Sequence, residues 1–324
     1  MDIGKRADSP IVRHPKNPIL TADDWPYPVN TVFNPGATIL PGGHTLLLCR
    51  VEDFRGISHF TVAQSENGVD GWHIDPQPTL EPDPENWPEE RWGIEDPRIT
   101  YVEELRKWVI VYTAFSRGGP GLSLALTDDF QHFERYGEIM PPEDKDAALL
   151  PRRIGGHWAL IHRPMGPLGG HIWISYSPDL RHWGSHKMIL EARRGAWWDA
   201  YKIGLCCPPI ETDRGWLMLY HGVRTTASGS IYRVGLALFD LDTPERCVLR
   251  GDSWIFGPEE VYEHEGDVHD VVFPCGYTMA PDGDTVNIYY GASDSWVALA
   301  TAKVSDMLDW LDENGRPGVC VDLD

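Results

Sequence analysis

Short runs of alternating apolar and polar residues recur along the whole chain. Each is followed by a turn rich in Ser, Thr or Asp, and often by an aromatic residue. Alternation with a period of two predicts β-strands that bury one face. Five such segments align with one another, at steps of roughly 60 residues. They are Thr61–Trp72, Ser123–Phe133, Trp173–Trp183, Gly235–Thr243 and Val297–Leu308.

A second repeated element lies between these segments: a proline, an apolar strand, a polar hairpin tip and a second apolar strand. Its leading prolines are Pro35, Pro97, Pro151, Pro208 and Pro274. Five units of about 60 residues, each with about four short strands, are typical of a β-propeller. A parallel α/β fold would need helices between the strands, and the one helix-like pattern is Val304–Leu311. A pair of β-sandwiches with accidental spacing is the alternative.

We therefore predict an all-β fold, a five-bladed β-propeller with a short C-terminal helix. Residues 1–324 would form a single domain, with 1–25 as an N-terminal extension and 304–324 as a C-terminal helix and tail. The 32 Gly and 27 Pro residues suit the many tight turns that such a fold needs. The extension either wraps the propeller or meets a neighbouring subunit, so a homo-oligomer stays open.

The charge of the chain limits its partners. With 49 acidic and 28 basic residues, its formal net charge is −21. Nucleic acids and anionic membranes bind clustered Lys and Arg, so we expect neither as a partner. The first residues contain no apolar run like a signal peptide, and nowhere do 18 apolar residues stand together. The 14 Trp and 12 Tyr residues serve either core packing or stacking on sugar rings.

The six cysteines lie in apolar or strand-like segments and show no C-x-x-C spacing. Buried free thiols in a reducing compartment explain this pattern better than disulfides or a zinc site. We therefore expect a cytoplasmic protein.

Polar residues at equivalent repeat positions meet at one mouth of a propeller, and Asp96 is the first candidate among them. It lies before a repeat-start proline, in a segment that begins with an aromatic residue. A general acid needs surroundings that raise its pKa, which Glu95 and Trp92 could supply. Alternatively, Asp96 only caps a turn before Pro97, and Arg98 pairs with Glu95.

Four basic residues from different repeat units form the second candidate group. They are Lys145, Arg163, Lys202 and His221. Arginine grips a phosphate with two parallel hydrogen bonds, and lysine supplies a point charge. Their meeting in such an acidic protein would make an anion site. Separate surface ion pairs are the alternative.

The segment His264–Asp270 contains two His and two Asp residues, but their spacing matches no standard metal site, so we expect no metal ion. Binding of sugar hydroxyls is a better use for Asp267 or Asp270.

Several motifs together resemble those of glycoside hydrolase family 130, in the same order, over about residues 30 to 300. They are Gly93–Arg98, Lys145–Pro151, His162–Pro164, Trp198–Asp199, Lys202–Gly204, Tyr220–Val223, Gly266–Val268 and Val272–Gly276. Members of this family are five-bladed propellers that act on β-mannosides. Most are inverting phosphorylases and a minority are hydrolases.

The resemblance implies a catalytic domain in which Asp96 is the proton donor, acting directly or through a sugar hydroxyl. Inorganic phosphate would attack the anomeric carbon from the opposite face and release α-mannose 1-phosphate, the inverting geometry with phosphate in place of water. It implies no cofactor, with phosphate as co-substrate. The expected substrates are β-1,4- or β-1,2-linked manno-oligosaccharides.

The resemblance also assigns the remaining site residues. Phosphate-binding positions map onto Lys145, Arg163, Lys202 and His221, although many phosphorylases have an Arg where this chain has Lys145. That exchange keeps the charge and loses the planar fork. The substrate-binding positions are Asn34, Arg50, Asp199, Tyr220 and Asp294.

Two other functions remain open. A β-mannosidase of the same fold would use water and a carboxylate base, for which Glu211 or Glu259 is available. A non-catalytic sugar-binding propeller is the third reading.

Overall fold

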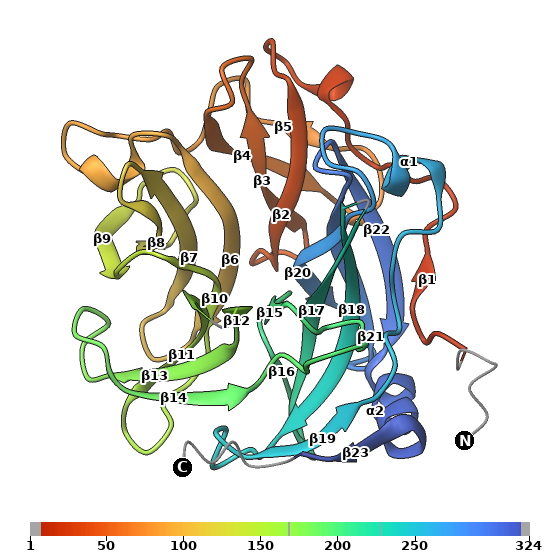
Figure 1. Ribbon diagram of the computed structural model, residues 1–324. Coiled ribbons are helices and arrows are strands. Elements are labelled where there is room, and N and C mark those ends of the chain that lie inside the picture. The colour runs from red at the N-terminus through yellow and green to blue at the C-terminus, as the bar shows by residue number, and fades with distance from the viewer. Residues whose placement is uncertain (1–7, 168, 228, 319–324) are drawn as a thin grey trace.

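The computed structural model of the chain describes residues 8–167, 169–227 and 229–318. Nearly all regular structure in these residues is β-strand, which confirms the all-β expectation. The described strands form four sheets. Figure 1 shows them following one another in chain order around a common centre. The ends of the expected N-terminal extension and C-terminal tail, residues 1–7 and 319–324, lie outside the described residues.

The first two sheets have four strands each, and every strand pairs antiparallel with the next one along the chain. The first consists of β2 (Thr31–Ile39), β3 (Thr45–Glu52), β4 (Ser58–Ser65) and β5 (His73–Ile74). The second consists of β6 (Ile94–Val102), β7 (Lys107–Ser116), β8 (Gly119–Thr127) and β9 (Glu134–Met140). This is the hairpin succession that the two repeated sequence elements predict.

The third sheet is larger, with 11 strands among the described residues. Its first part is β10 (Asp144–Leu149), β11 (Trp158–Gly166), β12 (Gly169–Gly170), β13 (Ile172–Ser177) and β14 (Gly184–Leu190). Its second part is β15 (Lys202–Leu205), β16 (Ile210–Thr212), β17 (Gly215–Thr226), β18 (Gly229–Phe239), β19 (Cys247–Gly251) and β23 (Gly315–Pro317). The two parts are joined through the two-residue strand β12, whose Gly170 pairs parallel with Lys202 of β15.

The fourth sheet brings the two ends of the chain together. It contains β20 (Val272–Met279), β21 (Thr285–Ala292), β22 (Trp296–Lys303) and β1 (Val12–Arg13). Strand β1 pairs antiparallel with β22, so the start of the chain joins the sheet made near its end. The helical elements are α1 (Val261–His264), α2 (Val304–Asn314) and the 3₁₀ turns η1 (Ala22–Asp24) and η2 (Pro88–Glu90).

Helix α2 confirms the expected C-terminal helix and continues three residues beyond the predicted end at Leu311. Val304, Met307, Leu308 and Leu311 are buried, at the spacing of one helix face. No helix in the described part of the chain is long and apolar enough to cross a membrane.

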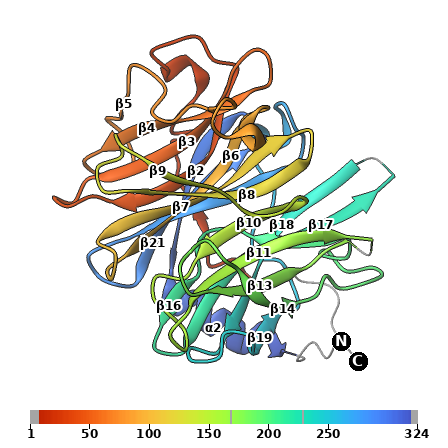
Figure 2. The ribbon, with the colours of Figure 1, turned by 90° about the vertical axis from the view of Figure 1, so that its left-hand side faces the viewer.

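The apolar cores lie between neighbouring sheets. Leu48 and Phe60 of the first sheet pack in one cluster with Ile110 and Tyr112 of the second. Full burial of each such side chain contributes about 1.5–3 kcal/mol to the free energy of folding, so packing between sheets holds the ring of sheets together. In Figure 2 the long β17–β18 hairpin extends beyond the other strands.

A β-bulge interrupts each of the strands β2, β6, β10 and β20. The register shifts fall between Phe33 and Gly36, Glu95 and Arg98, Lys145 and Ala148, and Pro274 and Gly276. Inside three of them Asn34, Asp96 and Asp146 adopt left-handed backbone angles, with φ of 45°, 53° and 56°. Asn and Asp enter this region more easily than other side chains. The bulge re-aims these side chains relative to a regular strand.

The described cysteines, Cys49, Cys206, Cys207, Cys247 and Cys275, are all buried and free, as expected. Cys320 lies outside the described residues.

Candidate active site

A polar pocket of about 150 Å³ opens among the first strands of the sheets. Its lining consists of the cations Arg50, Lys145, Arg163 and Lys202, the carboxyl groups of Asp96, Asp146 and Asp294, and Asn34, His221, Tyr232, Val268, Val271 and Phe273. Of the ten residues that the sequence predicts for the site, all but Asp199 and Tyr220 line this pocket. Residues as far apart in the sequence as Asn34 and Asp294 are thus brought together.

The Asp96 carboxyl group is buried, and both of its side-chain hydrogen bonds with described residues are made by Oδ1. Asn34 Nδ2 donates at 2.8 Å and Arg50 Nη1 at 3.0 Å. Among the described residues Oδ2 has no such donor, so it is available to a ligand in the pocket. The carboxyl group is therefore held in one orientation by two neighbours that the sequence assigns to substrate binding.

The expected surroundings of Asp96 differ in two ways from the structure. Trp92 packs edge-on against Phe115, is 44% exposed and does not line the pocket. Arg98 does not pair with Glu95: its guanidinium donates to the carbonyl oxygens of Asp96, Leu205 and Cys206 at 2.9–3.0 Å. Arg98 therefore ties the backbone at Asp96 to strand β15.

Glu95 links two of the pocket cations. Its carboxylate accepts a hydrogen bond from Lys145 Nζ at 2.7 Å and lies 3.2 Å from Arg50 Nη2. Burial alone would raise the pKa of Glu95, but the charges of Arg50 and Lys145 lower it to about 2. Glu95 is thus ionised at neutral pH and already neutralises much of the charge of Lys145.

Arg163 and Lys202 are the other two cations of the lining. Arg163 donates from Nε (3.0 Å) and Nη2 (2.7 Å) to Asp146 Oδ2, and its Nη1 has no hydrogen-bond partner among the described residues. Lys202 Nζ lies 5.5 Å from the centre of the Tyr232 ring and has no ion pair among the described residues. Burial, and then the charge of Arg163, lower the pKa of Lys202. A partly buried cation that makes no ion pair favours binding of an anion.

His221 contributes to the pocket without a charge. Burial lowers the pKa of His221 to about 3, so the ring is neutral at physiological pH. Its Nε2 is 3.4 Å from Asp146 Oδ2, while its buried Nδ1 has no hydrogen-bond partner. The ring packs against Tyr232 and Phe273. His221 is therefore available to hydrogen-bond a ligand, whereas the sequence prediction counted it among the cationic groups.

Asp199 and Tyr220 form a separate buried cluster. Asp199 accepts hydrogen bonds from Arg193 Nε (2.9 Å), Arg250 Nη2 (2.7 Å) and the Tyr220 hydroxyl (3.1 Å). The Trp198 ring stacks on Tyr220 at 5.5 Å. These contacts fasten the segment before β15 to strands β17 and β19, so the structure places both residues behind the pocket wall.

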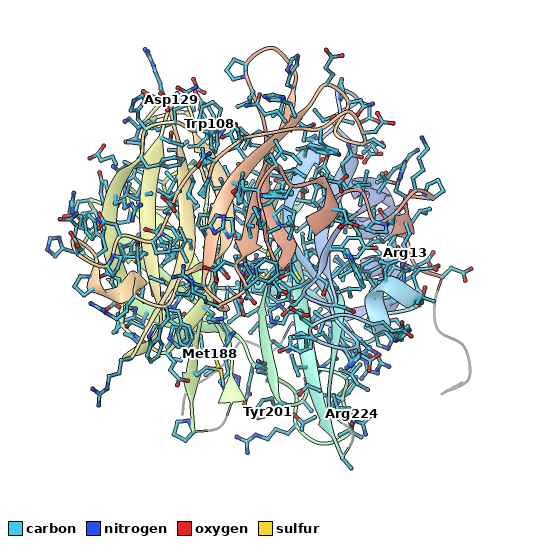
Figure 3. All side chains as sticks on the ribbon, turned by 90° about the horizontal axis from the view of Figure 1, so that it is seen from above. Arg13, Trp108, Asp129, Met188, Tyr201 and Arg224 are labelled. Carbon is cyan, nitrogen blue, oxygen red and sulfur yellow. The ribbon has the colours of Figure 1, made fainter. Side chains whose placement is uncertain are left out.

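The structure adds pocket residues that the sequence prediction did not include. Asp146 occupies the same repeat position as Asn34 and Asp96, and this equivalence could have identified it. Tyr232 and Phe273 carry no local signal, because apolar residues are common on every strand. From the His264–Asp270 segment Val268 lines the pocket, while Asp267 accepts from Asn30 Nδ2 and Asp270 pairs with His264. Figure 3 shows Tyr201 and Arg224 at one edge of the molecule. They are the chain neighbours of Lys202 and Val223, which pair with each other between β15 and β17.

Asp294 is expected to make stability depend on pH. Burial, aided by the nearby charge of Asp96, raises the pKa of Asp294 from 3.8 to about 6, although Arg50 opposes this. The folded state therefore binds the proton more tightly than the unfolded state between these values, and this contribution to stability is lost as the pH rises through them.

Relative to Asp294→Asn, the free energy of unfolding of the wild type should fall by up to about 3 kcal/mol as the pH rises from about 4 to above 6. Urea unfolding of both proteins across this range measures the difference. A difference that stays constant with pH would contradict the assignment.

A mostly β fold whose pocket holds an oriented carboxyl group, Asp96, together with a set of cations is suited to an enzyme that cleaves a glycosidic bond with an anion as second reactant. The chain belongs to glycoside hydrolase family 130, since residues 4–313 match the family model described as beta-1,4-mannooligosaccharide phosphorylase.

Two curated relatives are phosphorylases. The chain is 32% identical over 312 residues to the beta-1,4-mannooligosaccharide phosphorylase of Ruminococcus albus, covering 93% of this chain and 90% of the relative. It is 36% identical over 271 residues to the beta-1,2-mannobiose phosphorylase of Listeria innocua, covering 82% and 73%. The solved structure of a Listeria innocua beta-1,2-mannobiose phosphorylase in complex with beta-1,2-mannobiose superposes with a TM-score of 0.84 and 30% identity, covering 94% of this chain and 99% of that one.

Proposed function

We propose that this protein is an inverting β-mannoside phosphorylase that acts on β-1,4- or β-1,2-linked manno-oligosaccharides and forms α-mannose 1-phosphate. The observation that carries the proposal is Lys202, a pocket cation with no ion pair among the described residues, beside Arg163 and in the same pocket as Asp96. The relatives named above act as phosphorylases on both linkages.

The chemistry follows from these positions. Asp96 gives its proton to the glycosidic oxygen, directly or through a sugar hydroxyl, as the bond between that oxygen and the anomeric carbon breaks. An ionised phosphate oxygen forms the new bond to the anomeric carbon from the opposite face, which inverts its configuration. Phosphate is already an anion, so the reaction needs charge-matched positioning by Arg163, Lys202 and His221 rather than a base.

Asn34, Arg50 and Asp294 would bind the mannosyl unit, since they surround Asp96 in the lining. Lys145 is a weaker candidate for phosphate binding than Arg163 and Lys202, because its ammonium group already donates a hydrogen bond to Glu95. Asp199 and Tyr220 would support the site through β17, the strand that carries His221.

A hydrolase would need a carboxylate base near the substrate, and neither of the two candidates from the sequence, Glu211 and Glu259, is placed to act as one. Glu211 pairs with Arg152 at 2.7 Å and Glu259 with Arg13 at 2.9 Å, and neither lines the pocket.

We also propose that the whole chain, residues 1–324, is one catalytic domain with five blades. The narrow connection between β12 and β15 supports counting the large sheet as two blades. The free cysteines support a reducing compartment such as the cytoplasm.

The function is tested by incubating the protein with β-1,4- and β-1,2-mannobiose separately, with and without phosphate. We expect mannose 1-phosphate to form from one or both, only when phosphate is present. Release of free mannose at the same rate without phosphate would overturn the proposal in favour of a β-mannosidase. Binding of the disaccharides without any turnover would indicate a sugar-binding propeller.

A further inference from the structure

One pocket residue is unexpected in a site for an anion. Asp146 lies in the same lining as Arg163, Lys202 and His221, and its side chain is 2% exposed. Burial alone would raise the pKa of Asp146, but the nearby charge of Arg163 lowers it below the ordinary range, so the group is ionised. A fixed negative charge therefore faces the space that phosphate would occupy.

The Asp146 carboxylate is held tightly in place. Its Oδ2 receives both hydrogen bonds of the Arg163 fork and lies 3.4 Å from His221 Nε2. A Cβ at Gly204 would stand 2.4 Å from the same oxygen, so the glycine at this position of β15 makes room for the carboxylate.

The other carboxylate oxygen of Asp146, Oδ1, accepts no hydrogen bond from a side chain among the described residues. It lies 3.6 Å from Arg98 Nη2, which is longer than a hydrogen bond. An ionised carboxylate can only accept hydrogen bonds. An oxyanion beside Asp146 is therefore favoured if it brings a hydroxyl group and disfavoured if it brings only lone pairs.

We propose that Asp146 makes the anion site selective for an oxyanion that carries a proton, a selectivity that rests on the phosphorylase function proposed above. Near neutral pH phosphate and arsenate keep a hydroxyl group, whereas sulfate has none. The O–H···O⁻ bond to Asp146 is strong for the first two ions and absent for the third, which instead meets a like charge.

The same contact decides which phosphate oxygen reacts. The oxygen that faces Asp146 keeps its proton, so the attacking oxygen is one of the ionised oxygens that do not face Asp146. The product ester then leaves with that proton on its phosphate group and releases it to solvent, and Asp96 takes back from solvent the proton that it gave to the glycosidic oxygen.

The first test uses the wild-type protein. Formation of mannose 1-phosphate is measured at fixed mannobiose and phosphate with added arsenate or sulfate. Arsenate should compete with an inhibition constant within about threefold of the KM for phosphate, and sulfate should compete at least about tenfold more weakly, the value of one charged hydrogen bond. Sulfate that competes as well as arsenate would overturn the proposal.

The second test is Asp146→Asn, whose amide can donate to sulfate. The preference for phosphate over sulfate should fall at least about tenfold. Asp213→Asn, in an exposed turn before β17, should leave it unchanged. Because the readout is a ratio, a general loosening of Arg163 would weaken both ions alike and leave the ratio as in the wild type, which would overturn the proposal.

Failure of the two proposals can be told apart. A wild-type protein that forms no mannose 1-phosphate contradicts the phosphorylase function, and calorimetric titration with phosphate, arsenate and sulfate then tests the selectivity by itself. Equal affinity for phosphate and sulfate would refute it. If Asp146→Asn does not fold, the wild-type competition and titration decide the question.

Discussion

Replacement of Asp96 by Asn is expected to lower the kcat of phosphorolysis by about 10²–10⁴-fold, the usual contribution of a positioned general acid. The amide keeps an acceptor for Asn34 and Arg50, which both donate to Oδ1 at 2.8–3.0 Å in the wild type. It has no proton to give to the glycosidic oxygen. The fold and the binding of mannobiose should therefore persist while turnover is lost.

The measurement is a steady-state assay of mannose 1-phosphate formation, together with calorimetric binding of mannobiose and thermal unfolding. Asp128→Asn, in the exposed turn after β8, is the matched control and should keep full activity. Unchanged turnover in Asp96→Asn would place the acid elsewhere and reopen the sugar-binding reading.

Replacement of Lys202 by Met is expected to raise the KM for phosphate by about 10–150-fold, the value of one hydrogen bond to a charged group. Lys202 is the cleanest probe of the anion site, because no ion-pair partner among the described residues is left behind when its charge is removed. Removal of Arg163, in contrast, would leave the buried Asp146 carboxylate without its main partner.

The matched control is Lys187→Met, which removes an exposed lysine that pairs with Glu245 and should leave both KM values unchanged. The affinity of Lys202→Met for mannobiose should also stay the same. A KM for phosphate within twofold of the wild type would contradict the assignment of Lys202.

The convergence of the site could be predicted because it follows from repetition. Asn34 and Asp96 stand before prolines at the same place in successive repeats, and one bulge shape serves both. A repeated local pattern folds into a repeated local structure. Equivalent residues therefore reach the same mouth whatever their distance along the chain.

Which residues of a strand point into the pocket, and which point away from it, could not be predicted from the repeats. Neighbouring residues on a strand point to opposite sides. His221 lines the pocket, so Tyr220 points away from it and packs under Trp198. The sequence motif contains both residues and does not distinguish them, so both were predicted for the site.

The sequence by itself determined the all-β fold, the C-terminal helix and most of the pocket lining, because alternation, turn residues and repeats act over short distances. Only the tertiary structure decided which cations remain free. Lys145 is neutralised by Glu95, 50 residues away, while Lys202 keeps no such partner among the described residues. Ion pairing depends on distances across the pocket, and those distances exist only once the sheets have packed together.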